Sequence, residues 1–105
     1  MAITRYHNIV GSSAVTTELI APFEDISNIK SIVITNTHAT ADATITLFIQ
    51  KSTTSSTTTF KITNILKLPA GVSLLLDDKM FSITTDFGLY ITVGSSDTMD
   101  VLINL

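Results

Sequence analysis

The sequence predicts an all-β fold, namely a single-domain antiparallel β-sandwich of jelly-roll or immunoglobulin-like type with seven to eight strands. From residue 29 onward, apolar and polar side chains alternate through one short segment after another. A period of two is the mark of a half-buried strand. Turn-forming residues separate these segments at intervals of about eight to twelve residues. The connections are also too short for the helical crossovers of a parallel sheet, and 105 residues suit one domain.

The N-terminal segment admits two interpretations. Residues 1–13 end in a Gly-Ser-Ser sequence, and segments of this kind are poorly ordered unless something ties them down. The segment is either an arm that lies over a neighbouring subunit or the first edge strand, with Ile3 and Ile9 packed inward. We therefore divide the chain into residues 1–13, an arm or edge strand, and residues 14–105, the sandwich domain.

The remaining strands follow the alternation. We expect them at residues 14–20, 29–36, 43–50, 60–68, 72–76, 80–85, 89–93 and 99–105. A polar turn of about six residues joins 29–36 to 43–50, which predicts a hairpin of these two strands. The Ser/Thr-rich stretch 51–59 is expected to be an exposed loop with frayed strand at each end. Within 60–68, Ile65 falls on the opposite face from its apolar neighbours, which suggests a bulge near Asn64.

Composition excludes several classes of function. The net charge is −3 with no basic stripe, which argues against direct binding of nucleic acid. The absence of cysteine excludes disulfides and thiolate chemistry. We find no signal peptide and no run near the ~18 apolar residues of a membrane helix. Charged residues make up only 14%, which favours outer faces that are covered on assembly. The alternative is an ordinary sandwich whose outer faces are rich in threonine because threonine suits strands.

The chemistry-bearing residues form no catalytic pattern. The two histidines, His7 and His38, lack the three or four converging ligands of a metal site. Asp77 and Asp78 are adjacent carboxylates, but calcium needs about six to eight oxygen ligands, so turn chemistry is the first interpretation and a cation there stays open. No nucleophile motif or phosphate-binding loop is present. We therefore predict a protein that is not an enzyme, with no catalytic residue, cofactor or metal.

Several runs are similar to the small all-β virion structural proteins of tailed bacteriophages, of the capsid decoration (cement) type. They include Ser31-Ile32-Val33-Ile34-Thr35-Asn36-Thr37, Ala43-Thr44-Ile45-Thr46-Leu47-Phe48-Ile49 and Leu68-Pro69-Ala70-Gly71. The resemblance covers about three quarters of the chain, and it is one of general pattern. It implies contacts with the major capsid protein or other virion proteins, and a homotrimer or other homo-oligomer. The protein would be assembled in the host cytoplasm and located in the virion.

The resemblance leaves a second function open, that of a tail, baseplate or fibre component acting as a receptor- or carbohydrate-binding module. For either function, we expect partner contacts from the N-terminal segment and from aromatic residues on a sheet face. The candidate residues are Ile3, Arg5, Tyr6, Ile9, Phe48 and Tyr90. The Ser/Thr stretch 52–59 is expected to lie at a subunit or solvent edge.

Overall fold

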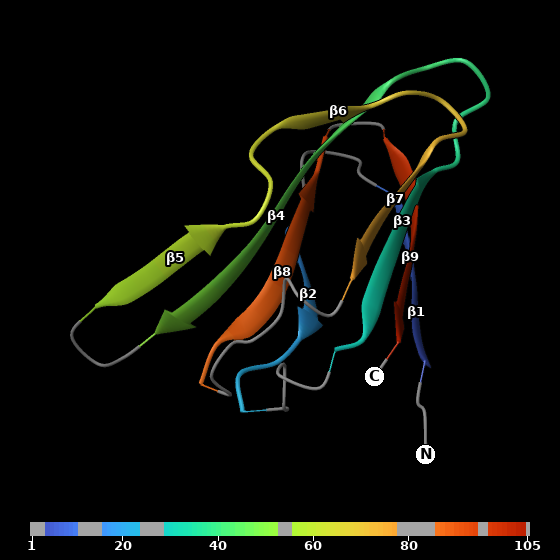
Figure 1. Cartoon of the computed structure of the whole chain (residues 1–105). Helices are drawn as coiled ribbons and strands as arrows, with labels where there is room; N and C mark the ends of the chain where they lie inside the picture. The colour runs from blue at the N-terminus through green and yellow to red at the C-terminus, as the bar shows by residue number, and fades with distance from the viewer. Residues whose placement is uncertain are drawn as a thin grey trace.

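Two antiparallel sheets pack face to face and enclose one core (Figure 1). The computed structural model describes residues 4–10, 16–23, 29–52, 56–77, 86–94 and 97–104. Within these residues there are nine strands and no helix. The prediction of an all-β antiparallel sandwich is therefore confirmed, with nine strands in place of seven or eight.

The first sheet, which we call sheet A, has the strand order β1-β9-β3-β7. Its strands are β1 (Thr4–Val10), β9 (Thr98–Asn104), β3 (Ser31–Asn36) and β7 (Ser73–Asp77). β9 is central and forms antiparallel ladders with both β1 and β3. Residues 4–10 thus form an edge strand of the sandwich.

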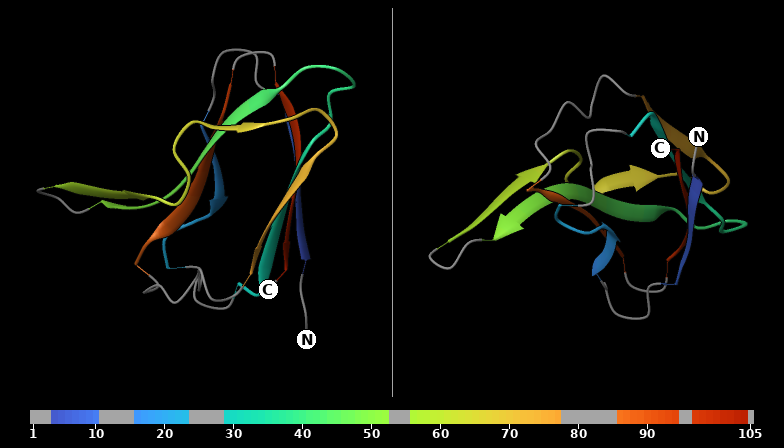
Figure 2. Two further views of the ribbon diagram at one scale, coloured as in Figure 1. Left: turned by 45° about the horizontal axis from the view of Figure 1, so that its top comes forward. Right: turned by 90° about the horizontal axis from the view of Figure 1, so that it is seen from below.

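The second sheet, sheet B, has the order β2-β8-β4-β5, and β6 pairs with the start of β4. Its strands are β2 (Thr16–Ile20), β8 (Gly88–Val93), β4 (Ala43–Ser52), β5 (Thr57–Lys61) and β6 (Leu66–Leu68). The end of β4 and the whole of β5 form a hairpin that projects beyond the sandwich (Figure 2).

The core lies between the sheets and contains the residues that the alternation predicts as inward-facing. In strands β3, β4, β8 and β9, ten of these inward-facing side chains are at most 1% exposed. They are Ile32, Ile34, Ile45, Leu47, Leu89, Ile91, Val93, Met99, Val101 and Ile103. Apart from the buried Gly88, their described neighbours along each strand are half-buried or exposed on the outer faces. The period of two therefore places these strands correctly.

The expected hairpin of 29–36 with 43–50 is wrong, because β3 and β4 lie in different sheets. Both edges of β3 are already paired, with β7 and with β9. Residues 37–42 instead cross from one sheet to the other. Asn36, at the end of β3, is fully buried, and its side-chain amide donates to the carbonyl oxygens of Ala41 and Leu68, both at 2.9 Å. Its Oδ1 accepts from the N–H of His38 at 3.0 Å.

The Ser/Thr-rich stretch has strand at both ends, as expected, because β4 extends to Ser52 and β5 begins at Thr57. Residues 53–55, in its middle, lie outside the described residues. The single strand expected at 60–68 is divided into β5 and β6. Between them the N–H groups of Ile62 and Thr63 both donate to the carbonyl of Leu47, and Ile65 adopts a positive φ of 52°. The interruption is thus wider than the predicted bulge. The strand expected at 80–85 lies outside the described residues.

Candidate functional site

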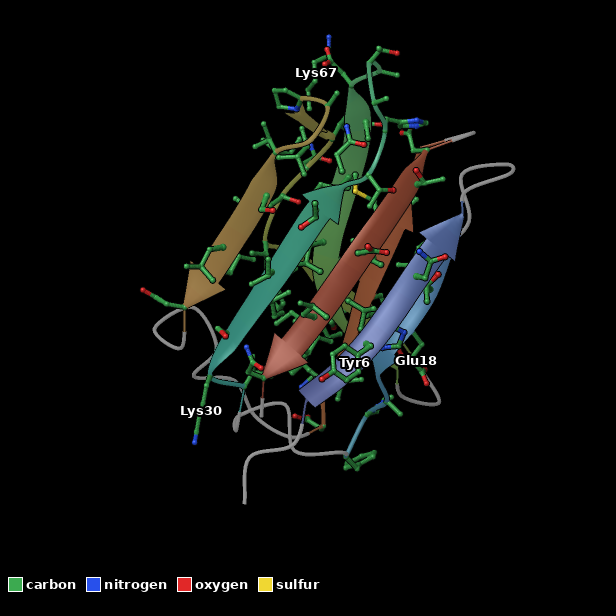
Figure 3. The ribbon with its side chains drawn as sticks, turned by 90° about the vertical axis from the view of Figure 1, so that its right-hand side faces the viewer. Tyr6, Glu18, Lys30 and Lys67 are labelled. Atoms are coloured by element: carbon green, nitrogen blue, oxygen red, sulfur yellow. The ribbon has the colours of Figure 1, made fainter. Side chains whose placement is uncertain are left out.

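The outer face of sheet A bears a row of apolar side chains that crosses all four strands. Tyr6 on β1 lies opposite Leu102 on β9, which lies opposite Val33 on β3, which in turn lies opposite Leu75 on β7. Tyr6 is 72% exposed, Leu75 65% and Leu102 37%. Figure 3 views this face and shows Tyr6 standing on it. No described element packs on the row, so four apolar residues in register face outward.

Polar pairs flank this apolar row on both sides. On one side, the Asn8 amide donates to Oδ1 of Asp100 at 2.7 Å, and the hydroxyls of Thr35 and Ser73 share a hydrogen bond of 2.7 Å. On the other side, the Asn104 amide donates to the Ser31 hydroxyl at 2.7 Å. These polar groups are already hydrogen-bonded to one another, so a partner that covers the face leaves few of them unsatisfied.

The outer face of sheet A is also hollowed at its β1 side. A depression of about 460 Å³ is lined by Tyr6, His7, Asn8, Thr35, Asp100 and Leu102. Sheet A therefore presents an apolar band with a hollow beside Tyr6, bordered by satisfied polar pairs. An apolar centre with a polar border is the composition of a protein–protein contact patch.

The outer face of sheet B carries a different row, in which two aromatic residues lie between opposite charges. The register runs from Glu18 on β2 to Tyr90 on β8, then Phe48 on β4 and Lys61 on β5. The rings of Phe48 and Tyr90 are stacked, with centroids 5.5 Å apart and planes inclined by 17°. One face of each ring is therefore covered by the other ring.

The Tyr90 phenol is held in its neutral form. Burial is the largest cause that raises its pKa above the ordinary value of 10.0, followed by the charge of Glu18 and the hydrogen bond between the two side chains. Two residues earlier on the same strand, Gly88 leaves no room for a side chain, because a Cβ there would come within 2.9 Å of the phenol oxygen and 3.0 Å of the Ile20 carbonyl oxygen. The Tyr90 hydroxyl therefore keeps its proton and donates a hydrogen bond to the Glu18 carboxylate.

A second hollow, of about 420 Å³, opens beside Phe48. It is lined by Thr46, Phe48, Gln50, Thr59, Lys61, Asn64, Ile65 and Thr92, and not by Tyr90. One wall is the segment between β5 and β6, which is fastened to β4 by two side-chain hydrogen bonds. The N–H of Ile65 donates to Oγ1 of Thr46, and Oγ1 of Thr63 accepts from the N–H of Leu47, each at 3.0 Å.

The described residues contain no group of three or more histidine, cysteine, aspartate or glutamate side chains that could hold a metal ion. His38 Nε2 lies 3.6 Å from Oδ1 of Asp97, and the other oxygen of that carboxylate accepts from the N–H of Thr44 at 3.1 Å. This contact fastens the crossover after β3 to the start of β4 and to the turn before β9. Asp78 lies outside the described residues, so a cation at Asp77 and Asp78 stays an open prediction.

The predicted contact residues fall in three different environments. Tyr6 is exposed on sheet A, and Phe48 and Tyr90 lie together on sheet B. Ile9 alternates with Asn8 along β1 and is buried in the core with 6% exposure, as the edge-strand interpretation expects, and its partner contact stays a prediction. Arg5 is placed only as part of β1, and Ile3 lies outside the described residues.

Three members of the sheet A row, Val33, Leu75 and Leu102, were missed by the sequence analysis. Each is the middle residue of three consecutive apolar residues, with buried or half-buried neighbours on both sides. A strand that is apolar on both faces indicates that both faces are covered. In a two-layer sandwich, only one face of each strand meets the core, so this pattern could have indicated the outer row.

Comparisons with known proteins give no family for the chain. No protein-family model matches it, and no curated protein matches it either. Across the described ranges, no helix has the length and apolar character needed to cross a bilayer.

Proposed function

We propose that the protein is a non-enzymatic structural protein of a phage virion, and within that class a capsid decoration protein that stabilises the head shell. The observation that supports this proposal is the outer face of sheet A. A partner is needed to cover the apolar row of Tyr6, Leu102, Val33 and Leu75, because exposed apolar rows of this kind mark interaction sites. The partner proposed is the major capsid protein.

The composition of the face suits repeated docking on a shell. The contact is an apolar band with a hollow beside Tyr6, and the polar groups at its border are hydrogen-bonded to one another. Such a contact need not be strong by itself, because copies that also touch one another bind with an effective concentration far above that of free protein. Low charge on the chain keeps repulsion between neighbouring copies small.

The test is co-sedimentation of the purified protein with empty shells of the phage that encodes it. The double variant Tyr6→Ser, Leu75→Ser should weaken shell binding at least about tenfold, because it removes both ends of the apolar row. The matched control is Ile65→Ser, which removes an equally exposed apolar side chain from sheet B (70% exposed) and should bind as the wild type does. Point variants are preferable to deletion of residues 1–13, since deletion also removes β1. Equal binding by all three proteins would refute the proposed face.

A second candidate function, a carbohydrate-binding module of a tail or fibre, is favoured by the hollow on sheet B. Phe48 borders this hollow, and Gln50, Lys61 and Asn64 supply hydrogen-bonding groups around it. An aromatic ring beside amide groups is suited to a sugar ring. A glycan array should then give hits that are lost in Phe48→Ser, whereas an array without hits removes this candidate.

A further inference from the structure

The Glu18–Lys61 row on sheet B is complementary to itself. It places one carboxylate and one ammonium at opposite ends of a row, with two apolar rings between them. Neighbouring strands lie about 4.8 Å apart, so three strand spacings put the Glu18 and Lys61 backbones about 14 Å from each other. Within one chain the Glu18 carboxylate is hydrogen-bonded to Tyr90 and the Lys61 ammonium donates to Oδ1 of Asn64 at 3.3 Å, so the two charges do not pair with each other.

We propose that the outer face of sheet B binds the same face of a second copy of this chain, through a two-fold axis parallel to the strands. A two-fold interface brings each surface patch against itself. An axis along the strands and midway between Tyr90 and Phe48 reverses the order of the row, so that Glu18 of one copy faces Lys61 of the other. The two aromatic stacks then lie against each other, Phe48 over Tyr90 in both directions.

Charge selects this axis over the alternative in-plane axis. An axis perpendicular to the strands keeps the order of the row, so it sets the two Glu18 carboxylates together and the two Lys61 ammonium groups together. Like charges placed opposite each other across an interface are strongly unfavourable. The proposed axis replaces both repulsions with two opposite-charge pairs.

The rows beside the aromatic pair present few unsatisfied polar groups to the interface. The hydroxyls of Thr16 and Thr92 are bonded to each other at 2.7 Å, and the Gln50 amide donates to Oγ1 of Thr59 at 3.0 Å. Covering these groups does not strip a hydrogen bond from them, so their desolvation opposes association weakly. The face that this dimer uses is opposite to the proposed shell-binding face, which stays free.

Charge exchange tests the proposal directly. The dissociation constant of the dimer is measured for full-length protein by sedimentation equilibrium, at concentrations up to about 1 mM and at low salt. Glu18→Lys and Lys61→Glu should each raise the dissociation constant at least about tenfold, because each places like charges across the interface. The double variant Glu18→Lys, Lys61→Glu should return it to within about threefold of the wild-type value, since the opposite-charge pairs are restored.

The control is Lys30→Glu, which reverses an exposed lysine that precedes β3 of sheet A and lies outside the proposed interface. This variant should leave the dissociation constant unchanged. A second readout is disulfide cross-linking, which is clean because the chain has no cysteine of its own. A mixture of the Glu18→Cys and Lys61→Cys proteins should form a mixed disulfide dimer faster than either variant alone forms a disulfide dimer with itself. A wild-type protein that is monomeric throughout, a mass of three copies, or a double variant that is no tighter than the single ones would overturn the proposal. None of these outcomes bears on shell binding by sheet A.

Discussion

Replacement of Asn36 by alanine should destabilise the fold more than replacement of any exposed asparagine. Asn36 is the only buried polar residue among those described, with 0% exposure. Its side chain makes three hydrogen bonds, to the carbonyl oxygens of Ala41 and Leu68 and from the N–H of His38. Together these bonds connect the end of β3 to the crossover and to the end of β6.

The magnitude follows from what the variant leaves behind. The Leu68 carbonyl is in a buried bond, and a buried group without its partner costs about 1–3 kcal/mol. The Ala41 and His38 groups are in partly buried bonds that water can replace, and each loss costs about 0.5–1.5 kcal/mol. We expect Asn36→Ala to lower the free energy of unfolding by about 2–6 kcal/mol, a large share of the about 5–15 kcal/mol typical of a domain.

Urea denaturation measures this loss as a fall in the midpoint with an unchanged slope. The control is Asn8→Ala, because Asn8 also lies on a strand and makes one hydrogen bond, to Asp100, on an exposed face. That variant should change stability by at most about 1 kcal/mol. If the two variants had equal midpoints, the account of Asn36 as the residue that fastens the crossover would be wrong.

Two further predictions concern the two faces of the strands. Leu47→Ala removes a core side chain with 0% exposure and should lower the free energy of unfolding by about 2–5 kcal/mol. Leu75→Ala, on the outer face, should change the free energy of unfolding by at most about 0.5 kcal/mol. Equal losses of the two variants in urea denaturation would contradict the assignment of faces. Tyr90 should ionise above pH 10.0 in an ultraviolet titration of a variant whose other tyrosine is phenylalanine, because burial and Glu18 raise its pKa. Since the folded state holds this proton more tightly than the unfolded state, the contribution to stability is full below pH 10 and is lost as pH rises through the folded pKa. In Glu18→Gln the pKa should fall but stay above 10.0, because burial is the larger cause.

The sequence predicted the layers of the fold better than their connections. Alternation placed Ile45, Leu47 and Ile49 in the core because the side-chain period depends only on the strand itself. It could not predict that β3 and β4 lie in different sheets, because that depends on which edges are occupied by strands distant in sequence. Alternation does not distinguish Asn36 either, because a single buried asparagine at the end of a strand leaves no periodic pattern.

The candidate surfaces could be predicted only in part, because side-chain periodicity is local whereas strand order depends on distant segments. Phe48 and Tyr90 were singled out as aromatic residues on outer faces, and the structure stacks them across neighbouring strands. Their charged neighbours, Glu18 and Lys61, come from strands far apart in the chain. Only strand order and register bring the four residues into one row, and neither is written in local sequence.

The place of β9 in sheet A constrains how the protein is made. The strand joins β1 to β3, so Thr4 lies opposite Asn104 and Ser31 lies opposite the same residue. During translation, β1 and β3 therefore have no common neighbour until residues 98–104 have left the ribosome. The apolar sides of β1 and β3 cannot belong to one sheet until that moment, when β9 joins the two strands, and pairings this distant form slowly. A ribosome that stops short of residue 98 would release a polypeptide prone to aggregate.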